Sequence, residues 1–221
     1  MATTTRVLRA RSAVAVLMLS ALSLVCPGWC DTAIAQDSTE IVRVEEEWEL
    51  VVSVPDPNSV GPQVTCVISP VGHTESLHAA FEINYQSLPE FVPGGLQLQL
   101  WSCEHPLASR KFPIGSVMQQ PGETVRWKQC LKLADGVLTF EILGGTSATW
   151  GSFGGQGYLK ASVPTALGNL NGYNPAVSVN NSGVSYAANR VQSLVLRKVR
   201  LVTSAGEVLE AEPQYSVYPK Q

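Results

Sequence analysis

The sequence predicts an all-β fold, a single antiparallel β-sandwich of the jelly-roll or concanavalin-like type that follows an N-terminal signal peptide. Apolar and polar residues alternate in many short segments, as they do in sheets with one buried face and one wet face. Clusters of Pro, Gly, Asn and Asp separate these segments, which is typical of turns. Sustained helical periodicity is missing from the sequence.

The expected strands follow this alternation along the chain. Trp48, Leu50 and Val52 share one face of the first strand, and the longest later strand is interrupted by Gln129. Asp135-Gly136 predicts a tight hairpin, because this pair accepts the positive φ of such a turn. The expected strands are residues 48–54, 64–68, 81–85, 96–100, 125–133, 138–142, 159–163, 191–203 and 207–210. About ten short strands in one domain, residues 36–221, favour a sandwich.

The first 35 residues have the pattern of a signal peptide. Arg6, Arg9 and Arg11 precede an uncharged, mostly apolar run at residues 12–25. A bilayer span needs ~20 such residues, so this run is short for an anchor and suits a signal-peptide core. Residues 33–35 (Ala-Ile-Ala) have the small-x-small pattern of a cleavage site.

Cleavage there would leave a mature chain that begins at Gln36, with residues 36–44 as a loose lead-in. We expect an exported protein, periplasmic, on the cell surface or extracellular, with no membrane span once the signal is removed. Lipidation at Cys26 and an uncleaved anchor are the two alternatives.

The charge balance excludes one class of partner. The chain has 15 Lys and Arg against 18 Asp and Glu, whereas a nucleic-acid-binding protein needs a basic face. Charged residues make up 15% of the chain and hydrophobic residues 45%, so disorder is not expected. The acidic run Glu45–Glu47 is expected to be a solvated strand edge that discourages aggregation.

Three cysteines remain after the signal: Cys66, Cys103 and Cys130. Export permits disulfides, and an odd number allows at most one bridge within the chain. Cys103 with Cys130 is the expected pair, because both flank predicted strands. Cys66 replacing either of them, and three buried thiols, are the alternatives.

Catalytic motifs are missing from the sequence. His73 and His78 lack the H-E-x-x-H spacing, and neither a G-x-S-x-G elbow nor a phosphate-binding loop occurs. We therefore expect no catalytic residue, metal or cofactor. One carboxylate pair could serve glycoside hydrolysis, Glu82 and Glu141, each on the polar face of its strand, and the alternative is that both simply face solvent.

The best candidate for a ligand site is the glycine-rich stretch 144–157. Trp150 and Phe153 lie in it, and Asn171 and Tyr173 follow in an amide-rich segment. Aromatic rings stack on apolar ligand faces, and amides hydrogen-bond hydroxyl-rich ligands. The alternative is a long connection whose rings cover the end of the core, with the asparagines forming turns.

Several segments resemble a known group of proteins. These are residues 44–50 (VEEEWEL), 55–58 (PDPN), 63–66 (QVTC) and Trp150-Gly151. They resemble exported β-sandwich proteins of planctomycete-type bacteria with a concanavalin- or laminin-G-like pattern, a group without an assigned activity. The resemblance implies an exported sandwich and supplies no catalytic residue.

These observations predict a non-enzymatic exported protein with a structural or interaction role at the cell envelope or outside it. The expected partners are glycans or envelope proteins, and the sequence does not set the oligomeric state. A carbohydrate-binding module that uses the aromatic residues of the glycine-rich stretch is the alternative. A glycoside-active enzyme is the third hypothesis.

Overall fold

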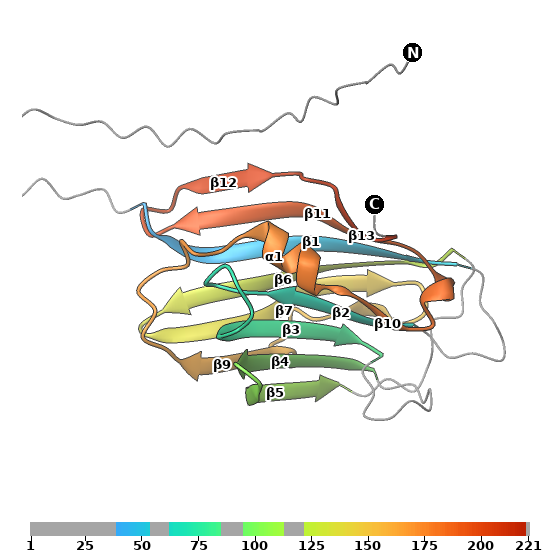
Figure 1. Ribbon diagram of the computed structural model, residues 1–221, viewed down its shortest axis with the longest axis horizontal. Helices are drawn as coiled ribbons and strands as arrows, with labels where there is room; N and C mark the ends of the chain where they lie inside the picture. The colour runs from blue at the N-terminus through green and yellow to red at the C-terminus, as the bar shows by residue number, and fades with distance from the viewer. Residues whose placement is uncertain (1–38, 54–61, 85–94, 113–121, 220–221) are drawn as a thin grey trace, which may run out of the picture. The chain divides into compact units, whose positions relative to one another are not determined.

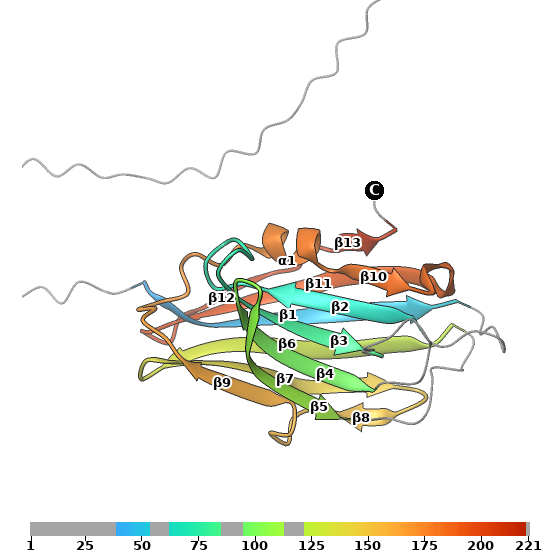
Figure 2. The same cartoon turned by 60° about the horizontal axis from the view of Figure 1, so that its bottom comes forward.

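A computed structural model describes residues 39–53, 62–84, 95–112 and 122–219. In these residues the strands are antiparallel and form two sheets that pack face to face (Figure 1, Figure 2). The predicted all-β sandwich is therefore confirmed. The expected signal peptide lies outside the described residues, within which no helix is long and apolar enough to cross a membrane.

The larger sheet, sheet A, has eight strands in the described part of the chain. They are β1 (Ile41–Val52), β6 (Thr124–Ala134), β7 (Val137–Ser147), β8 (Gly151–Phe153), β9 (Lys160–Pro164), β11 (Val191–Thr203), β12 (Val208–Ala211) and β13 (Tyr215–Tyr218). The order is β12-β11-β1-β6-β7-β8, with β13 paired to β11 and β9 paired to β7. β1 begins at Ile41, so residues 41–44 of the expected lead-in are strand.

The smaller sheet, sheet B, has five strands within the same described ranges, in the order β10-β2-β3-β4-β5. They are β2 (Gln63–Ile68), β3 (Leu77–Ile83), β4 (Leu96–Ser102), β5 (His105–Phe112) and β10 (Gly183–Tyr186). A short 3-10 helix, Ala188–Arg190, leads from β10 into β11.

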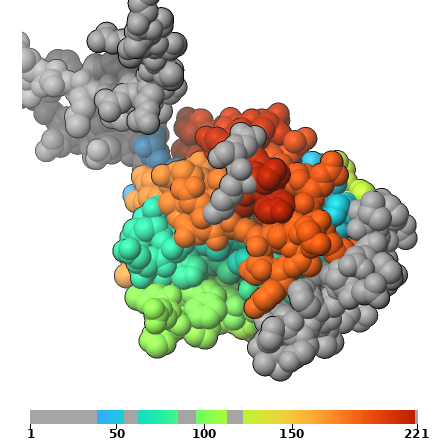
Figure 3. Space-filling model, turned by 45° about the vertical axis from the view of Figure 1, so that its right-hand side comes forward, coloured from blue at the N-terminus to red at the C-terminus, as the bar shows by residue number. Residues whose placement is uncertain are grey.

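Different elements cover the two edges of the sandwich. β9 contacts β4 and β5 at one edge, and helix α1 (Pro175–Asn181) contacts β2 and β13 at the other. The helix begins after Asn174, whose side-chain oxygen accepts a hydrogen bond from the backbone N–H of Ala176 at 2.9 Å, and Pro175 suits the first helical position. Figure 3 shows the orange segment around α1 between the red C-terminal strand and the teal residues of sheet B.

Aromatic rings join the two sheets in the core. Trp48 of β1 stacks on Trp127 of β6, with ring centroids 6.2 Å apart and planes 7° from parallel. Phe81 of β3, in the opposite sheet, lies 5.8 Å from the Trp127 ring. All three side chains are at most 3% exposed. Large rings buried in contact contribute both buried area and favourable ring geometry.

A carboxyl group is also buried in this core. Glu46 of β1 points inward and is 0% exposed. It accepts hydrogen bonds from Trp48 Nε1 at 2.9 Å, Gln129 Nε2 at 2.8 Å, the Tyr173 hydroxyl at 2.8 Å and the Ser178 hydroxyl at 2.5 Å. Burial raises the pKa of Glu46, although these hydrogen bonds lower it.

The acidic run is therefore not the solvated strand edge that the sequence predicted. β1 lies between β11 and β6 in sheet A. Glu45 is 3% exposed and Glu46 is fully buried, while the Glu47 side chain is 42% exposed. That prediction was wrong because the run alternates between an inward and an outward position of a central strand, and polar partners satisfy both buried carboxyls.

We predict that the fold is more stable in acid because of Glu46. Its pKa is higher in the fold than in the unfolded chain, so its contribution to stability is complete at low pH and is lost as the pH rises through the folded-state pKa. The other titratable groups beside it, Tyr173 and Cys66, stay neutral because burial raises the pKa of both. Urea unfolding between about pH 4 and pH 8 would show the decline.

The matched variant is Glu46→Gln, whose single side-chain oxygen can accept from both Trp48 and Gln129 and whose amide nitrogen can donate to the two hydroxyls. It should fold and lose this part of the pH dependence. Glu46→Leu should lose about 3 kcal/mol, because several buried donors then lack an acceptor. An unchanged pH slope in Glu46→Gln would contradict the assignment.

Candidate functional site

The outer face of sheet B carries a row of polar side chains from four adjacent strands. Thr65 of β2 pairs with Glu82 of β3, Glu82 pairs with Gln97 of β4, and Gln97 pairs with Lys111 of β5. Directly paired residues on one face have Cβ atoms about 5 Å apart, so these four side chains form a continuous row.

Glu82 is the carboxyl group at the centre of this row. One of its oxygens accepts a hydrogen bond from Gln97 Nε2 at 2.5 Å. Burial raises the pKa of Glu82 above its ordinary value of 4.5, while hydrogen bonds from Gln97 and Thr65 and the charge of Lys111 lower it. A partly exposed carboxyl with a raised pKa suits proton transfer, because both of its forms are populated nearer to neutral pH.

Gln97 connects Glu82 to a second amide. Gln97 is 7% exposed, and its Nε2 also donates to the side-chain oxygen of Gln99 at 2.9 Å. Both N–H groups of the Gln97 amide are thereby used. Gln99 is partly exposed, and within the described residues its own amide nitrogen has no hydrogen-bond partner, so it can donate to a ligand on this face.

Two rings lie on the same face. His78 of β3 and Trp101 of β4 are paired across the sheet, with ring centroids 6.4 Å apart and planes 5° from parallel. Burial lowers the pKa of His78 below its ordinary value of 6.5, so the ring is neutral over more of the physiological range. The outer face of sheet B therefore combines a carboxyl–amide cluster, centred on Glu82, with a neutral aromatic pair.

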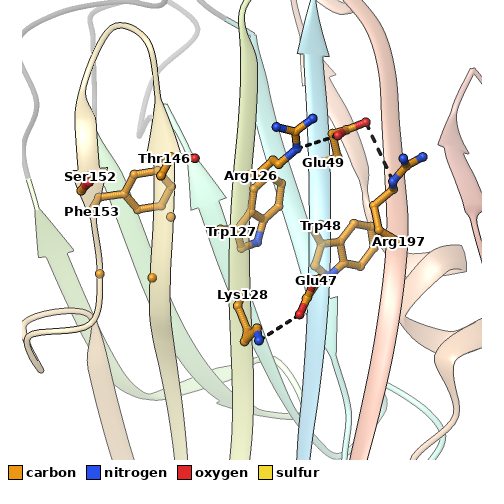
Figure 4. Close-up of a pocket in the computed structure, with 13 residues that line it drawn as sticks. Glu47, Trp48, Glu49, Arg126, Trp127, Lys128, Thr146, Ser152, Phe153 and Arg197 are labelled. Atoms are coloured by element: carbon orange, nitrogen blue, oxygen red, sulfur yellow. Dashed lines mark hydrogen bonds and ion pairs between the residues drawn. The ribbon is translucent and has the colours of Figure 1, made fainter. Parts of the chain in front are cut away.

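A hollow of about 730 Å³ lies on the outer face of sheet A, between β11, β1, β6, β7 and β8 (Figure 4). Its charged side chains are paired. Glu49 lies 2.8 Å from Arg126 and 4.0 Å from Arg197, and Glu47 lies 2.9 Å from Lys128. Because its carboxylates and cations already pair with one another, this hollow suits binding of a charged ligand better than proton transfer.

Of the two aromatic residues predicted to bind a ligand in the glycine-rich stretch, Phe153 is buried and Trp150 is partly buried. Phe153 is 3% exposed, and its ring occupies the space where a side chain at Gly145 would lie. Trp150 is partly buried and meets Phe153 edge-on at 6.3 Å. The glycine at position 145 is thus needed for packing, and this stretch closes the end of the core.

The two other predicted ligand residues lie in a separate segment. The Tyr173 hydroxyl donates to Glu46 in the core. The side-chain oxygen of Asn171 accepts a hydrogen bond from the backbone N–H of Ile41 at 2.8 Å. Tyr173 and Asn171 thus hold the segment before α1 against β1.

Glu82 and Glu141 do not form the carboxylate pair that glycoside hydrolysis needs. Glu82 lies on β3 of sheet B, and Glu141 lies on β7 of sheet A, where it contacts Lys160 at 3.9 Å. Both side chains point outward, on opposite sides of the sandwich. The two residues cannot act on one glycosidic bond.

The three cysteines are free thiols. Cys103 is exposed in the turn after β4, and Cys130 is buried on β6 of the other sheet, so the expected Cys103–Cys130 bridge is not formed here. Burial raises the pKa of Cys130 to about 11, which keeps it protonated and unreactive. Among the described residues, His, Cys, Asp and Glu form no group of three or more that could hold a metal ion.

Comparisons with known proteins bear on the fold. No protein-family model and no curated protein matches the sequence, so the resemblance to planctomycete-type exported proteins stays a prediction. The chain is similar to scytalido-glutamic peptidase bound to a peptide-based transition-state analogue, at 12% identity and a TM-score of 0.32, over 79% of this chain and 81% of that one.

Two further solved structures are similar to the same extent. One is SCP-B, a member of the eqolisin family of peptidases, in a complex with the tripeptide Ala-Ile-His, at 12% identity and a TM-score of 0.30, over 79% of this chain and 81% of that one. The other is scytalido-glutamic peptidase with a transition-state analogue inhibitor, at 12% identity and a TM-score of 0.26, over 80% and 78%.

These neighbours are enzymes, which contradicts the expectation of a non-enzymatic structural or interaction protein. We therefore reject that expectation, together with its carbohydrate-binding and glycosidase alternatives. At TM-scores of 0.32 and below, the likeness supplies no residue and no mechanism for this chain. Its chemistry has to come from its own geometry.

We predict that Gln97 tunes the acidity of Glu82. Gln97→Met removes a hydrogen bond to the ionised carboxylate and keeps the length of the side chain, so the pKa of Glu82 should rise further. A carbon-13 NMR titration of the Glu82 carboxyl measures this directly. Gln192→Met, at an exposed position of β11, is the control and should leave the titration unchanged. A lower or unaltered pKa in Gln97→Met would refute the role.

Proposed function

We propose that this protein is a hydrolase in which Glu82 transfers the proton and the substrate is a peptide bond of an extended polypeptide. One observation carries the proposal: a partly buried carboxyl with a raised pKa is hydrogen-bonded to Gln97 on an outer sheet face. Proton-transfer groups need this combination of access, orientation and adjusted pKa.

The reaction needs one proton acceptor that later becomes a proton donor. Ionised Glu82 takes a proton from a water molecule while the water oxygen attacks the carbonyl carbon of the peptide. The neutral Glu82 carboxyl then gives that proton to the leaving nitrogen as the C–N bond breaks, which returns the carboxylate to its starting form. No other co-reactant is consumed.

The neighbouring groups have distinct roles in this proposal. Gln97 holds the Glu82 carboxyl in place and fixes the amide of Gln99 by a second hydrogen bond. The amide nitrogen of Gln99 donates to the oxyanion of the tetrahedral intermediate, which a preorganised donor stabilises. The charge of Lys111, which lowers the pKa of Glu82, helps to keep part of the carboxyl ionised.

The open sheet face accepts an extended chain, because an extended polypeptide repeats every ~6.6 Å, the same as the side chains of a strand. The neutral His78–Trp101 pair on this face offers an apolar contact to a substrate side chain.

Export is part of the proposal, since residues 1–35 have the signal-peptide pattern. The hydrolase would then act in the periplasm, on the cell surface or outside the cell. We predict that mass spectrometry of the protein from its own host shows an N-terminus near Gln36. A chain that retains residues 1–35 would contradict cleavage at this site.

The decisive prediction concerns two glutamates on opposite sheets. Glu82→Gln should lower kcat/KM for an unfolded protein substrate at least about 100-fold, because the proton-transfer group is lost. Glu141→Gln removes an equivalent outward carboxyl from sheet A and should leave kcat/KM unchanged. Release of new amino groups at mildly acidic pH measures the rate.

Gln99→Leu tests the second role and should lower kcat on the order of 100-fold. Urea unfolding of each variant shows whether the fold is intact. Equal loss of activity in Glu82→Gln and Glu141→Gln, or no turnover by the unaltered protein, would refute the proposal.

A further inference from the structure

The outer face of sheet A carries an excess of positive charge, although the whole chain has a formal net charge of -3. The outward positions of β1, β6, β7, β9, β11 and β12 hold eight basic and five acidic side chains. The basic ones are Arg43, Arg126, Lys128, Lys132, Lys160, Arg197, Lys198 and Arg200, and the acidic ones are Glu45, Glu47, Glu49, Glu141 and Glu210.

The carboxylates on this face are shared among several cations. Glu45 lies 2.6 Å from Arg43, 3.1 Å from Arg200 and 3.8 Å from Lys128. Lys132 has no ion pair within the described residues. Because the basic side chains on this face outnumber the acidic ones, the remaining positive charge is available to an anionic ligand.

Three hollows on this face adjoin one another, because successive hollows share lining residues. The hollow of about 730 Å³ shares Lys128 and Gly144 with a second of about 430 Å³. The second shares Arg43 and Leu143 with a third of about 230 Å³, which Lys132 and Lys160 also line. We call this surface the basic trough, and Figure 4 shows the hollow of about 730 Å³, with Arg126 and Lys128 on β6 and Arg197 on β11, on either side of β1.

We propose that the basic trough binds an acidic segment of a polypeptide in an extended conformation, with Asp or Glu at alternate residues. Arg126, Lys128 and Lys132 stand at outward positions of one strand, β6, so they repeat at multiples of ~6.6 Å. Carboxylates at alternate residues of an extended peptide have the same repeat. Arg and Lys bind carboxylates through charge-assisted hydrogen bonds.

Two other polyanions fit the basic trough less well. The aromatic residues that line it, Trp48, Trp127 and Phe153, have their rings in the core and are at most 3% exposed, so none offers an open face for a sugar to stack on. Nucleic acid carries closely and evenly spaced phosphates, some of which would meet Glu47 and Glu49 between the cations. A peptide can leave uncharged residues at these places.

The test uses the full protein and a fluorescein-labelled peptide of about 12 residues with alternating Glu and Thr, which extends over roughly 40 Å. Fluorescence anisotropy should show saturable binding at about 20 mM salt that weakens severalfold at about 200 mM, because salt screens exposed charges. A Lys–Thr peptide of the same length should not bind.

Three variants locate the site. Lys128→Ser and Lys132→Ser should each raise the Kd about two- to fivefold. Gly144→Leu changes no charge and fills the trough, where a side chain at this position meets nothing within 4 Å, and should raise the Kd on the order of tenfold. Arg110→Ser, at an exposed position of β5 in sheet B, is the control and should bind as the unaltered protein does.

The inference fails if none of the three variants weakens binding, or if heparin or single-stranded DNA binds more tightly than the acidic peptide. It is independent of the proposed hydrolase, because Glu82 lies on the other sheet. Glu82→Gln should therefore bind the peptide with an unchanged Kd while it loses hydrolysis. A protein that binds but does not hydrolyse would keep this inference and refute the other.

Discussion

The buried carboxyl of Glu46 is the constraint on which much of this sandwich depends. Placing it in the core between two sheets is unfavourable unless its oxygens are hydrogen-bonded. The donors come from β1 itself, from β6 and from the segment that carries Tyr173 and Ser178. The segment before α1 must therefore run across the edge of the sandwich. Once it lies there, β10 follows directly and pairs with β2, which completes sheet B.

The side chains at inward positions form the core, so the side chains available to a ligand lie on the two outer faces. These two faces differ in chemistry. Within the described strands of sheet B, the outer face has one carboxyl, Glu82, and burial raises its pKa although hydrogen bonds from Gln97 and Thr65 and the charge of Lys111 lower it. The face of sheet A pairs its carboxylates with cations, as at Glu45, which lies beside Arg43 and Arg200. The first arrangement suits proton transfer and the second suits binding of charged ligands.

Alternation predicted the central strands because each has one buried face, as in β3 and β4, where Phe81 and Leu98 point inward. It could not predict β5, which is an edge strand with mostly exposed residues, or α1, which depends on capping by Asn174. The predictions for polar residues at inward positions were wrong for a related reason. The sequence predicted that Gln129 interrupts a strand and that Glu46 faces solvent. Both predictions were wrong because only the register of β1 against β6 shows that these two residues are paired.

The sequence predicted only part of the candidate site, for the same reason. Glu82 was placed on the polar face of its strand, but its partner Gln97 depends on the pairing of β3 with β4. The two raised pKa values then act in opposite directions. Glu82 gains its basic form as the pH rises, whereas the fold loses the stabilising neutral form of Glu46. In the proposed hydrolase, the fraction of Glu82 that can take a proton from water therefore falls as the pH falls, while the Glu46 contribution to stability changes in the opposite direction.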